Sequence, residues 1–191
     1  MRHVARKFIG AVVLAGALTL TACGTPLREP PGTVGDDYPA YGVPLDVSWP
    51  SDWLSGYGSE AGAVGAPIVG LRLEYVDDRW VWRVRTIDPG RDLFGEQVTE
   101  PDRGSEAFID ASTREVLKHH FVELTDAELA EVELSAYDAA QLSGEAYPSP
   151  RLVELTRQLE NGRPVWVVTT LDTENGTFSV LTLDALEPVP E

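Results

Sequence analysis

The sequence predicts an α+β fold of two repeated units, each a helix packed on a small antiparallel β-sheet (meander). A shift of 84 residues aligns 51–88 with 135–172 without a gap, and the ten identities in this alignment favour a duplication rather than a solenoid. Each aligned segment begins with a helix-like pattern and continues into alternating apolar strands separated by turn sequences. Trp82 and Trp166 occupy the same position in the two copies, which is typical of core packing rather than of ligand stacking.

The second copy has the clearer elements. Ser135 is a good N-cap for an alanine-rich helix over 136–146, which ends at a proline-rich stretch. A strand is predicted over 151–159, and Asn161-Gly162 is a favoured two-residue hairpin turn. Further strands are predicted over 165–171 and 178–183, separated by a turn at Asn175-Gly176.

The first copy repeats this order with strands over 67–75, 80–87 and 106–110 and a turn at Asp77-Asp78. Its helix is weaker, because each of several glycines after residue 55 costs about 1 kcal/mol relative to alanine. A loop over 89–104 has no counterpart in the second copy. Between the copies, 116–124 is predicted to be a strand, and Thr125 with Glu128 forms a capping-box pattern for a short helix.

The N-terminus is typical of an export signal. Three basic residues precede an apolar run over 8–20, which is too short to span a bilayer stably. The run ends in Leu20-Thr21-Ala22-Cys23, and this ending resembles the lipobox of bacterial lipoproteins. The resemblance implies cleavage before Cys23 and a diacylglyceryl group on its sulfur. We therefore expect a protein of the cell membrane that is lipid-anchored and faces outside the cytoplasm.

These patterns predict four segments. Residues 1–22 are the lipoprotein signal peptide, and 23–50 comprise the lipidated cysteine and a tether rich in proline and glycine. The first unit spans 51–124 and the second spans 125–191. The second half of the tether is unusually apolar for a free linker, because it contains Tyr38, Tyr41 and Trp49, and it can therefore lie against the folded domain.

The chain is strongly acidic. Its formal net charge is −16, and removal of a signal with three cations leaves −19. A charge this negative opposes contact with phosphate backbones, so we expect no nucleic-acid partner. Solubility of an exposed protein explains most of the acidity. Cys23 is the single cysteine, which leaves no thiol for a disulfide.

The order of helix, strand, turn and strand, closed by an Asp-Ala-x-Thr-x-Glu-Val segment, resembles the PepSY domain family. The best match is the stretch from Ile109 to Leu117, where Arg114 stands in place of the usual glycine. The resemblance covers about 51–187 as two tandem PepSY-like units. It implies a helix-and-sheet fold without catalytic residues. PepSY units also occur in the propeptides of metalloproteases, where they assist folding and inhibit the enzyme, so a peptidase is one implied partner.

The sequence offers no convincing catalytic, cofactor or metal site. His119 and His120 are adjacent and would point to opposite faces of a strand. The stretch 172–183 fails the spacing of an EF-hand loop, because its fifth residue is glycine and its twelfth is leucine. We therefore predict no catalytic residues, no metal ligands and no cofactor.

The sequence favours a non-enzymatic module that is tethered to the membrane and binds a protein partner, such as a peptidase or another envelope component. Two alternatives stay open. One is a carrier of small ligands or lipids, which would need a cavity. The other is a hydrolase that depends on carboxylates alone, for which Asp88, Asp110, Asp172 and Asp184 are the candidates.

Overall fold

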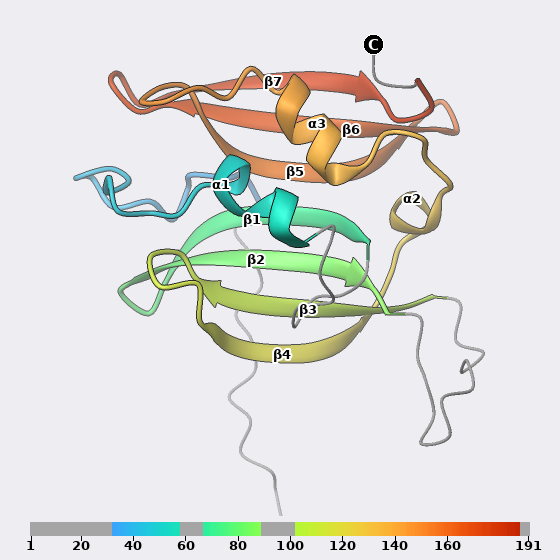
Figure 1. The fold of residues 1–191 in the computed structure, drawn as a ribbon, viewed down its shortest axis with the longest axis horizontal. Coiled ribbons are helices and arrows are strands. Elements are labelled where there is room, and N and C mark those ends of the chain that lie inside the picture. Colours follow the sequence, from blue (N-terminus) through green and yellow to red (C-terminus); the bar gives the residue numbers. More distant parts are fainter. Residues whose placement is uncertain (1–31, 58–66, 89–101, 188–191) are drawn as a thin grey trace, which may run out of the picture.

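The computed structural model describes residues 32–57, 67–88 and 102–187, which form one antiparallel sheet and three short helices (Figure 1). The sheet order is β4-β3-β2-β1-β5-β6-β7. The helices are α1 (Pro50–Tyr57), α2 (Asp126–Leu129) and α3 (Ala136–Leu142). The strands are β1 (Ile68–Val76), β2 (Arg79–Ile87), β3 (Arg103–Asp110), β4 (Val116–Glu123), β5 (Arg151–Glu160), β6 (Arg163–Asp172) and β7 (Thr177–Asp184).

The predicted fold class is wrong, because the strands do not form two separate small sheets. β1 and β5 pair directly, and this pairing joins all strands into one seven-stranded sheet. The seam is antiparallel and short: Gly70, Leu71 and Arg72 lie opposite Thr156, Leu155 and Glu154. Leu71 and Leu155, which the 84-residue offset aligns, therefore face each other. The aligned segments contribute matching strands, but to one sheet with only short helices on it.

The predicted strands and turns are largely confirmed. Asn161 and Gly162 have φ angles of 52° and 78°, which suits the turn between β5 and β6. Arg114 has a φ of 64° and so adopts the left-handed conformation for which glycine was expected. The carboxylate of Asp110 supports this turn by accepting the amides of Ser112 and Thr113 at 3.0 and 2.8 Å.

Two boundaries differ from the prediction. The helix expected over 136–146 ends at Leu142, because Gly144, just after the C-cap Ser143, has a φ of 76° and so adopts the left-handed conformation that ends helices. β3 begins at Arg103, inside the loop predicted over 89–104. Residues 89–101 of that loop lie outside the described residues, as do 58–66.

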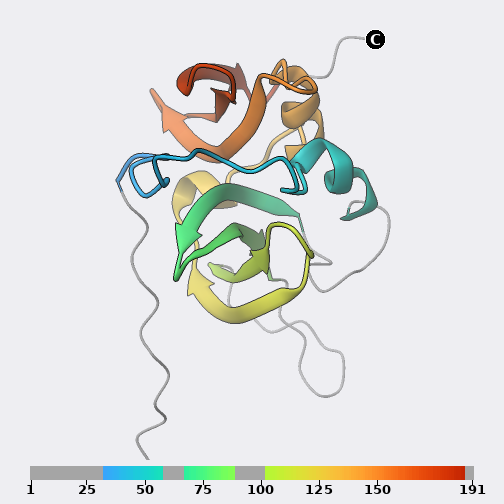
Figure 2. The ribbon, with the colours of Figure 1, turned by 90° about the vertical axis from the view of Figure 1, so that its left-hand side faces the viewer.

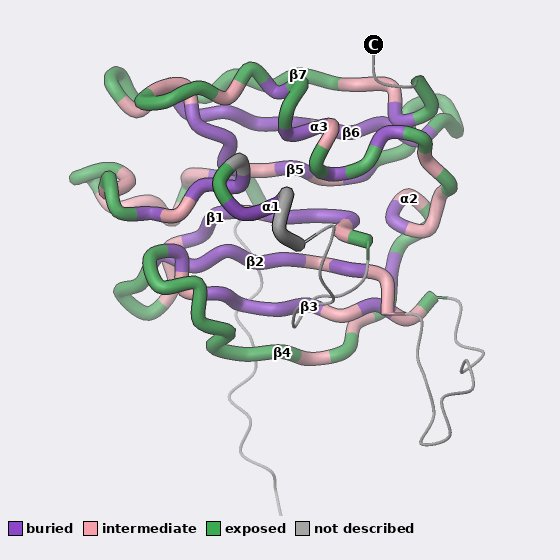
Figure 3. The backbone as a smooth tube through the Cα atoms, viewed as in Figure 1, coloured by how far each residue is buried: buried purple, intermediate pink, exposed green. Residues whose placement is uncertain are grey.

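The apolar core lies between the sheet and the helices α1 and α3, which share one face (Figure 2). Trp82 and Trp166 are 1% and 0% exposed, which confirms the prediction that they are core residues. Both indole nitrogens are satisfied: Nε1 donates to Ser48 O in Trp82 and to Leu134 O in Trp166, each at 2.8 Å. Figure 3 shows that burial concentrates in the five inner strands, β3, β2, β1, β5 and β6, whereas the edge strands β4 and β7 are mostly exposed.

The segment before α1 packs against the sheet, in agreement with the apolar character noted for the second half of the tether. Val34, Val47 and Trp49 are buried in the core. The Tyr38 hydroxyl donates to Leu73 O at 3.0 Å, and Asp37 Oδ2 accepts the Tyr75 amide at 2.6 Å. In the ranges that the structure covers, no helix is long and apolar enough to cross a membrane.

Candidate functional site

The face of the sheet away from α1 and α3 carries charged side chains on its central strands. In β1 and β2, arginine and glutamate alternate with core residues, and in a strand successive side chains point to opposite faces. Several charged residues of β1, β2 and the neighbouring β3 are nevertheless buried: Glu74 is 0% exposed, Arg83 8% and Glu106 4%. Charged groups are rarely buried this deeply unless they are paired.

The buried charges form a continuous chain of ion pairs. Arg83 binds Glu74 with two bonds, Nε to Oε1 at 2.8 Å and Nη2 to Oε2 at 3.0 Å. Glu106 accepts from Arg83 and from Arg85, each at 3.1 Å. Arg85 then binds Glu128 with two bonds, Nε to Oε1 at 2.6 Å and Nη2 to Oε2 at 3.1 Å.

Glu128 reaches this chain because of the way α2 begins. Thr125 and Glu128 form the predicted capping box, in which the Thr125 hydroxyl accepts the Glu128 amide and the Glu128 carboxylate accepts the Thr125 amide. The same carboxylate receives Arg85. One side chain therefore both starts the helix and fixes α2 to β2.

Glu74 and Glu128 are the two end members of the ion-pair chain, and their environments shift their pKa values in opposite directions. Burial raises the pKa of the Glu74 carboxyl, although Arg83 opposes that rise. Burial also acts to raise the pKa of Glu128, but hydrogen bonds from Arg85 and Thr125 outweigh it, so this pKa is lowered. Of these two carboxyls, Glu128 is therefore the one whose ionised form the fold stabilises.

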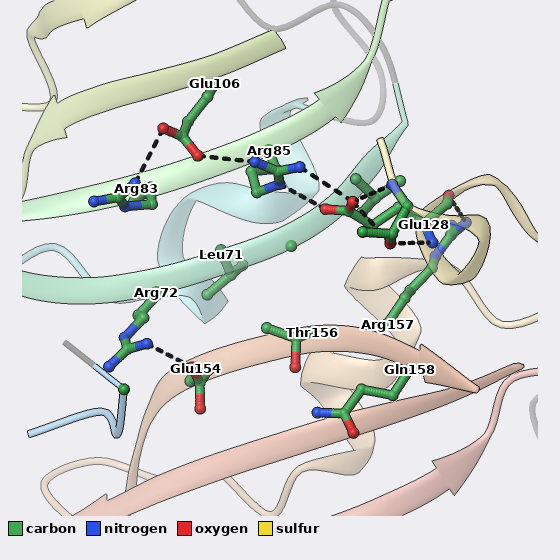
Figure 4. A pocket seen from close by; sticks show the side chains of 14 residues that line it. Leu71, Arg72, Arg83, Arg85, Glu106, Glu128, Glu154, Thr156, Arg157 and Gln158 are labelled. Atoms are coloured by element: carbon green, nitrogen blue, oxygen red, sulfur yellow. Dashed lines mark hydrogen bonds and ion pairs between the residues drawn. The ribbon is translucent and has the colours of Figure 1, made fainter. Parts of the chain in front are cut away.

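A cavity of about 500 Å³ lies beside this chain, near the point where β1 and β5 stop pairing (Figure 4). β5 continues to Glu160, whereas its pairing with β1 ends at Thr156. Arg157, just beyond the seam, donates from Nη1 to Glu128 O and Ala130 O at 3.1 and 3.2 Å and lies over the Trp166 ring. Arg72, Arg83, Arg85, Glu106, Glu128 and Glu154 supply the charges of the wall.

The structure does not bring the predicted candidate residues together in this cavity. Cys23 lies outside the described residues. His119 lies opposite Ala107 and His120 opposite Glu106, and the alternation of the strand directs the two rings to opposite faces. His120 Nε2 is 3.3 Å from Glu106 Oε2, so one of the two histidines contacts a carboxylate of the ion-pair chain.

The four aspartates named for a hydrolase serve local contacts. Asp88 accepts from Arg103 at 3.0 Å, and Asp184 accepts from Arg163 at 2.7 Å. Asp110 and Asp172 each accept amides of the turns that follow them, and these bonds lower the pKa of both carboxyls. Among the described residues, no group of three or more His, Cys, Asp or Glu is placed to hold a metal ion.

The sequence analysis did not identify the residues that line the cavity, although the sequence contains one indication of them. In 71–75 and 82–86, charged residues occur at every second position between apolar ones. A half-buried strand shows the same alternation when its charged face is simply solvated. The burial of these charges depends on partners from β3 and α2, which sequence spacing does not reveal.

We predict that Glu128→Gln lowers the free energy of unfolding by about 1.5–3 kcal/mol at neutral pH, the range for hydrogen bonds to charged groups. The folded pKa of Glu128 lies below its ordinary value, so its ionised form stabilises the fold above that value. This contribution is lost as the pH falls through the folded pKa. Urea unfolding at a series of pH values should therefore show the difference from wild type shrinking below about pH 4.

Glu131→Gln provides the matched control, because Glu131 is exposed on the segment that follows α2. It removes the same charge and should leave stability within about 0.5 kcal/mol of wild type. A loss for Glu128→Gln that is equal at all pH values would contradict the assigned role of its ionised form.

Comparison with known proteins adds little to these observations. No family model matches the sequence, and no curated protein matches it. A solved structure described as a putative lipoprotein from Clostridium difficile 630 aligns with 71% of this chain and 93% of its own, at 15% identity and a TM-score of 0.34. A TM-score this low supports no argument about fold or function. The PepSY resemblance stays a prediction.

Proposed function

We propose that the protein is a lipid-anchored, non-enzymatic module outside the cytoplasm, and that it binds a protein partner along the edge strand β7. The anchor rests on the lipobox-like sequence that ends at Cys23. The observation that carries the binding role is the exposure of β7. Six of its eight residues, Thr177–Thr182, are exposed, and β7 forms one edge of the sheet.

An exposed edge strand offers unpaired backbone donors and acceptors to an incoming strand. Side chains on β7 add apolar contact area: Phe178 is 41% exposed, Val180 67% and Leu181 41%. The strand contains neither proline nor a charged residue before Asp184. It therefore lacks two of the usual features that prevent an edge from pairing with another chain, a proline and a charge within the strand.

The opposite edge, β4, is less suited to the same role. Its sequence contains Lys118, His119, His120 and Glu123, so polar or charged side chains interrupt its apolar residues. Charges on an edge strand disfavour addition of another strand. The contrast between the two edges supports β7 as the docking strand.

The identity of the partner follows only from the PepSY resemblance, which implies a peptidase or another envelope component. In this proposal the folded body holds no catalytic residues and acts by contact alone. The lipid anchor would confine both partners to the membrane surface. Stable anchoring takes more than one acyl chain, which the acylation pattern implied by the lipobox supplies.

The anchor can be tested separately. Cells fed a labelled fatty acid should incorporate the label into the wild-type chain and not into Cys23→Ala, because only the thiol at this position is available for the thioether. Mass spectrometry of the N-terminal peptide should place the modification on Cys23. A free thiol on the mature wild-type chain would contradict the proposal.

The docking strand can be tested by photo-crosslinking in intact cells. We expect a photoreactive residue at Ser179 in the anchored full-length chain to form one discrete adduct with another protein. Val180→Lys should reduce this adduct at least several-fold, because a lysine on the edge disfavours strand addition. Val180 is mostly exposed, so the substitution should not unfold the sheet.

Leu117→Lys is the matched control, because Leu117 is 40% exposed on the other edge strand. It should leave the adduct unchanged. An adduct with a second copy of this chain, or equal loss in both variants, would contradict a partner-specific role for β7.

A further inference from the structure

The two ends of β7, the docking strand of the proposed function, carry acidic side chains. Glu174 is exposed in the turn that precedes β7, and Glu187 is exposed shortly after the strand ends. Glu133 is also exposed, and its backbone amide donates to Ala185 O at 2.9 Å, which places it beside the end of the strand. Negative charge therefore frames this edge of the sheet at both ends.

The arginines of this half of the chain do not offset that charge. Residues 125–187 contain twelve aspartates and glutamates but only three arginines and no lysine. Arg151 and Arg157 are buried, with 4% and 8% exposure. Arg163 is the only exposed arginine of these residues, and its Nη2 donates to Asp184 Oδ2 at 2.7 Å. An incoming chain therefore meets more negative than positive charge here, which favours a cationic partner.

Between its acidic ends, β7 is apolar on both faces. Leu181 lies opposite Val168, a core residue that is 0% exposed, so Leu181 points to the face that carries α3. Because successive side chains of a strand alternate, Phe178 and Val180 point to the other face. The side chains of an added strand alternate in the same way, so they would meet apolar groups on either face.

The first described segment of the chain supports β7 on the face opposite α3. The centroid of the Phe178 ring lies 6.1 Å from that of the Tyr38 ring, and a Cβ added to Gly35 would overlap the Phe178 ring. Phe178 nevertheless stays 41% exposed. It therefore offers an incoming side chain an aromatic contact that residues 35–38 hold in place.

The same charges disfavour pairing of β7 with the β7 of a second copy. In an antiparallel pair, the start of one strand lies beside the end of the other, which would bring Glu174 toward Glu187 of the partner copy. In a parallel pair, like ends would meet. Either arrangement places carboxylates side by side, and like charges across a strand pair are destabilising. This edge is therefore suited to a different chain.

We propose that β7 binds an extended segment of its partner whose apolar centre is framed by lysine or arginine at both ends. This inference rests on the proposed function, because it specifies the chemistry of the segment that β7 takes up. The eight residues of β7 extend about 26 Å, so the centre of the segment has about five to seven residues. Backbone pairing supplies the affinity, and the basic ends select against segments with acidic ends.

The test is a titration of the isotope-labelled full-length chain in detergent micelles with the peptide acetyl-Lys-Lys-Val-Thr-Val-Thr-Val-Lys-Lys-amide, followed by NMR of the backbone amides. The signals of β7 should shift with a saturating dependence on peptide, and those of β4 should stay in place. The peptide with glutamate in place of every lysine should bind at least about fivefold more weakly at low salt. Added salt should narrow this difference, because it screens exposed charges.

The acidic ends can be tested by substitution. Glu174→Gln combined with Glu187→Gln should weaken binding of the lysine peptide about two- to fivefold, and both sites are exposed, so the chain should stay folded. Glu115→Gln combined with Glu123→Gln is the matched control. It removes two exposed carboxylates at the ends of the opposite edge strand and should leave binding unchanged.

A lysine peptide with proline in place of the central valine keeps all its charges but pairs poorly as a strand. Equal binding of this peptide would show that charge alone attracts it and would overturn the inference. Equal affinity for the lysine and glutamate peptides, with shifts confined to β7, would overturn the charge selection and leave edge docking in place. Absence of shifts in β7 with either peptide would also overturn the inference, whereas the photo-crosslink at Ser179 decides the proposed function independently.

Discussion

The three-residue seam between β1 and β5 is the constraint on which the other features depend. It joins strands from two distant parts of the chain into one sheet, so that α1 and α3 meet on a shared face and contact each other. Leu71 and Leu155 lie at its centre and are fully or almost fully buried. Because the pairing stops after three residues, the strands part beyond it. The space that results is lined by charged residues, and Glu128 of α2 is one of them.

The chain of buried ion pairs follows from this geometry. α2 lies near the end of the seam, and Glu128 connects it to β2 through Arg85. Burial of ions is costly and is only offset where each charge is well paired. Arg83 and Arg85 meet that condition with bidentate partners.

Local sequence patterns predicted the strands and turns well, since these depend on neighbours in the chain. The turn at Asn161-Gly162 and the capping box at Thr125 are examples. The same patterns could not predict that β1 would pair with β5, because the two halves could equally have formed separate sheets. The cavity could not be predicted for the same reason. Glu106 and Glu128 belong to β3 and α2, and only the assembled sheet brings these elements to Arg85. Alternating charges in β1 and β2 gave a signal that a solvated strand face would also produce.

Hydrogen exchange at the seam tests the central claim that the described chain is one cooperative sheet. If the seam is integral, the protected amides of Gly70–Arg72 and Glu154–Thr156 should exchange with the same free energy as the most protected amides of β2 and β6. Exchange at the seam through a distinctly smaller opening, while β2 and β6 stay protected, would show that the halves separate. In that case neither the continuous sheet nor the cavity beside it would describe the folded protein.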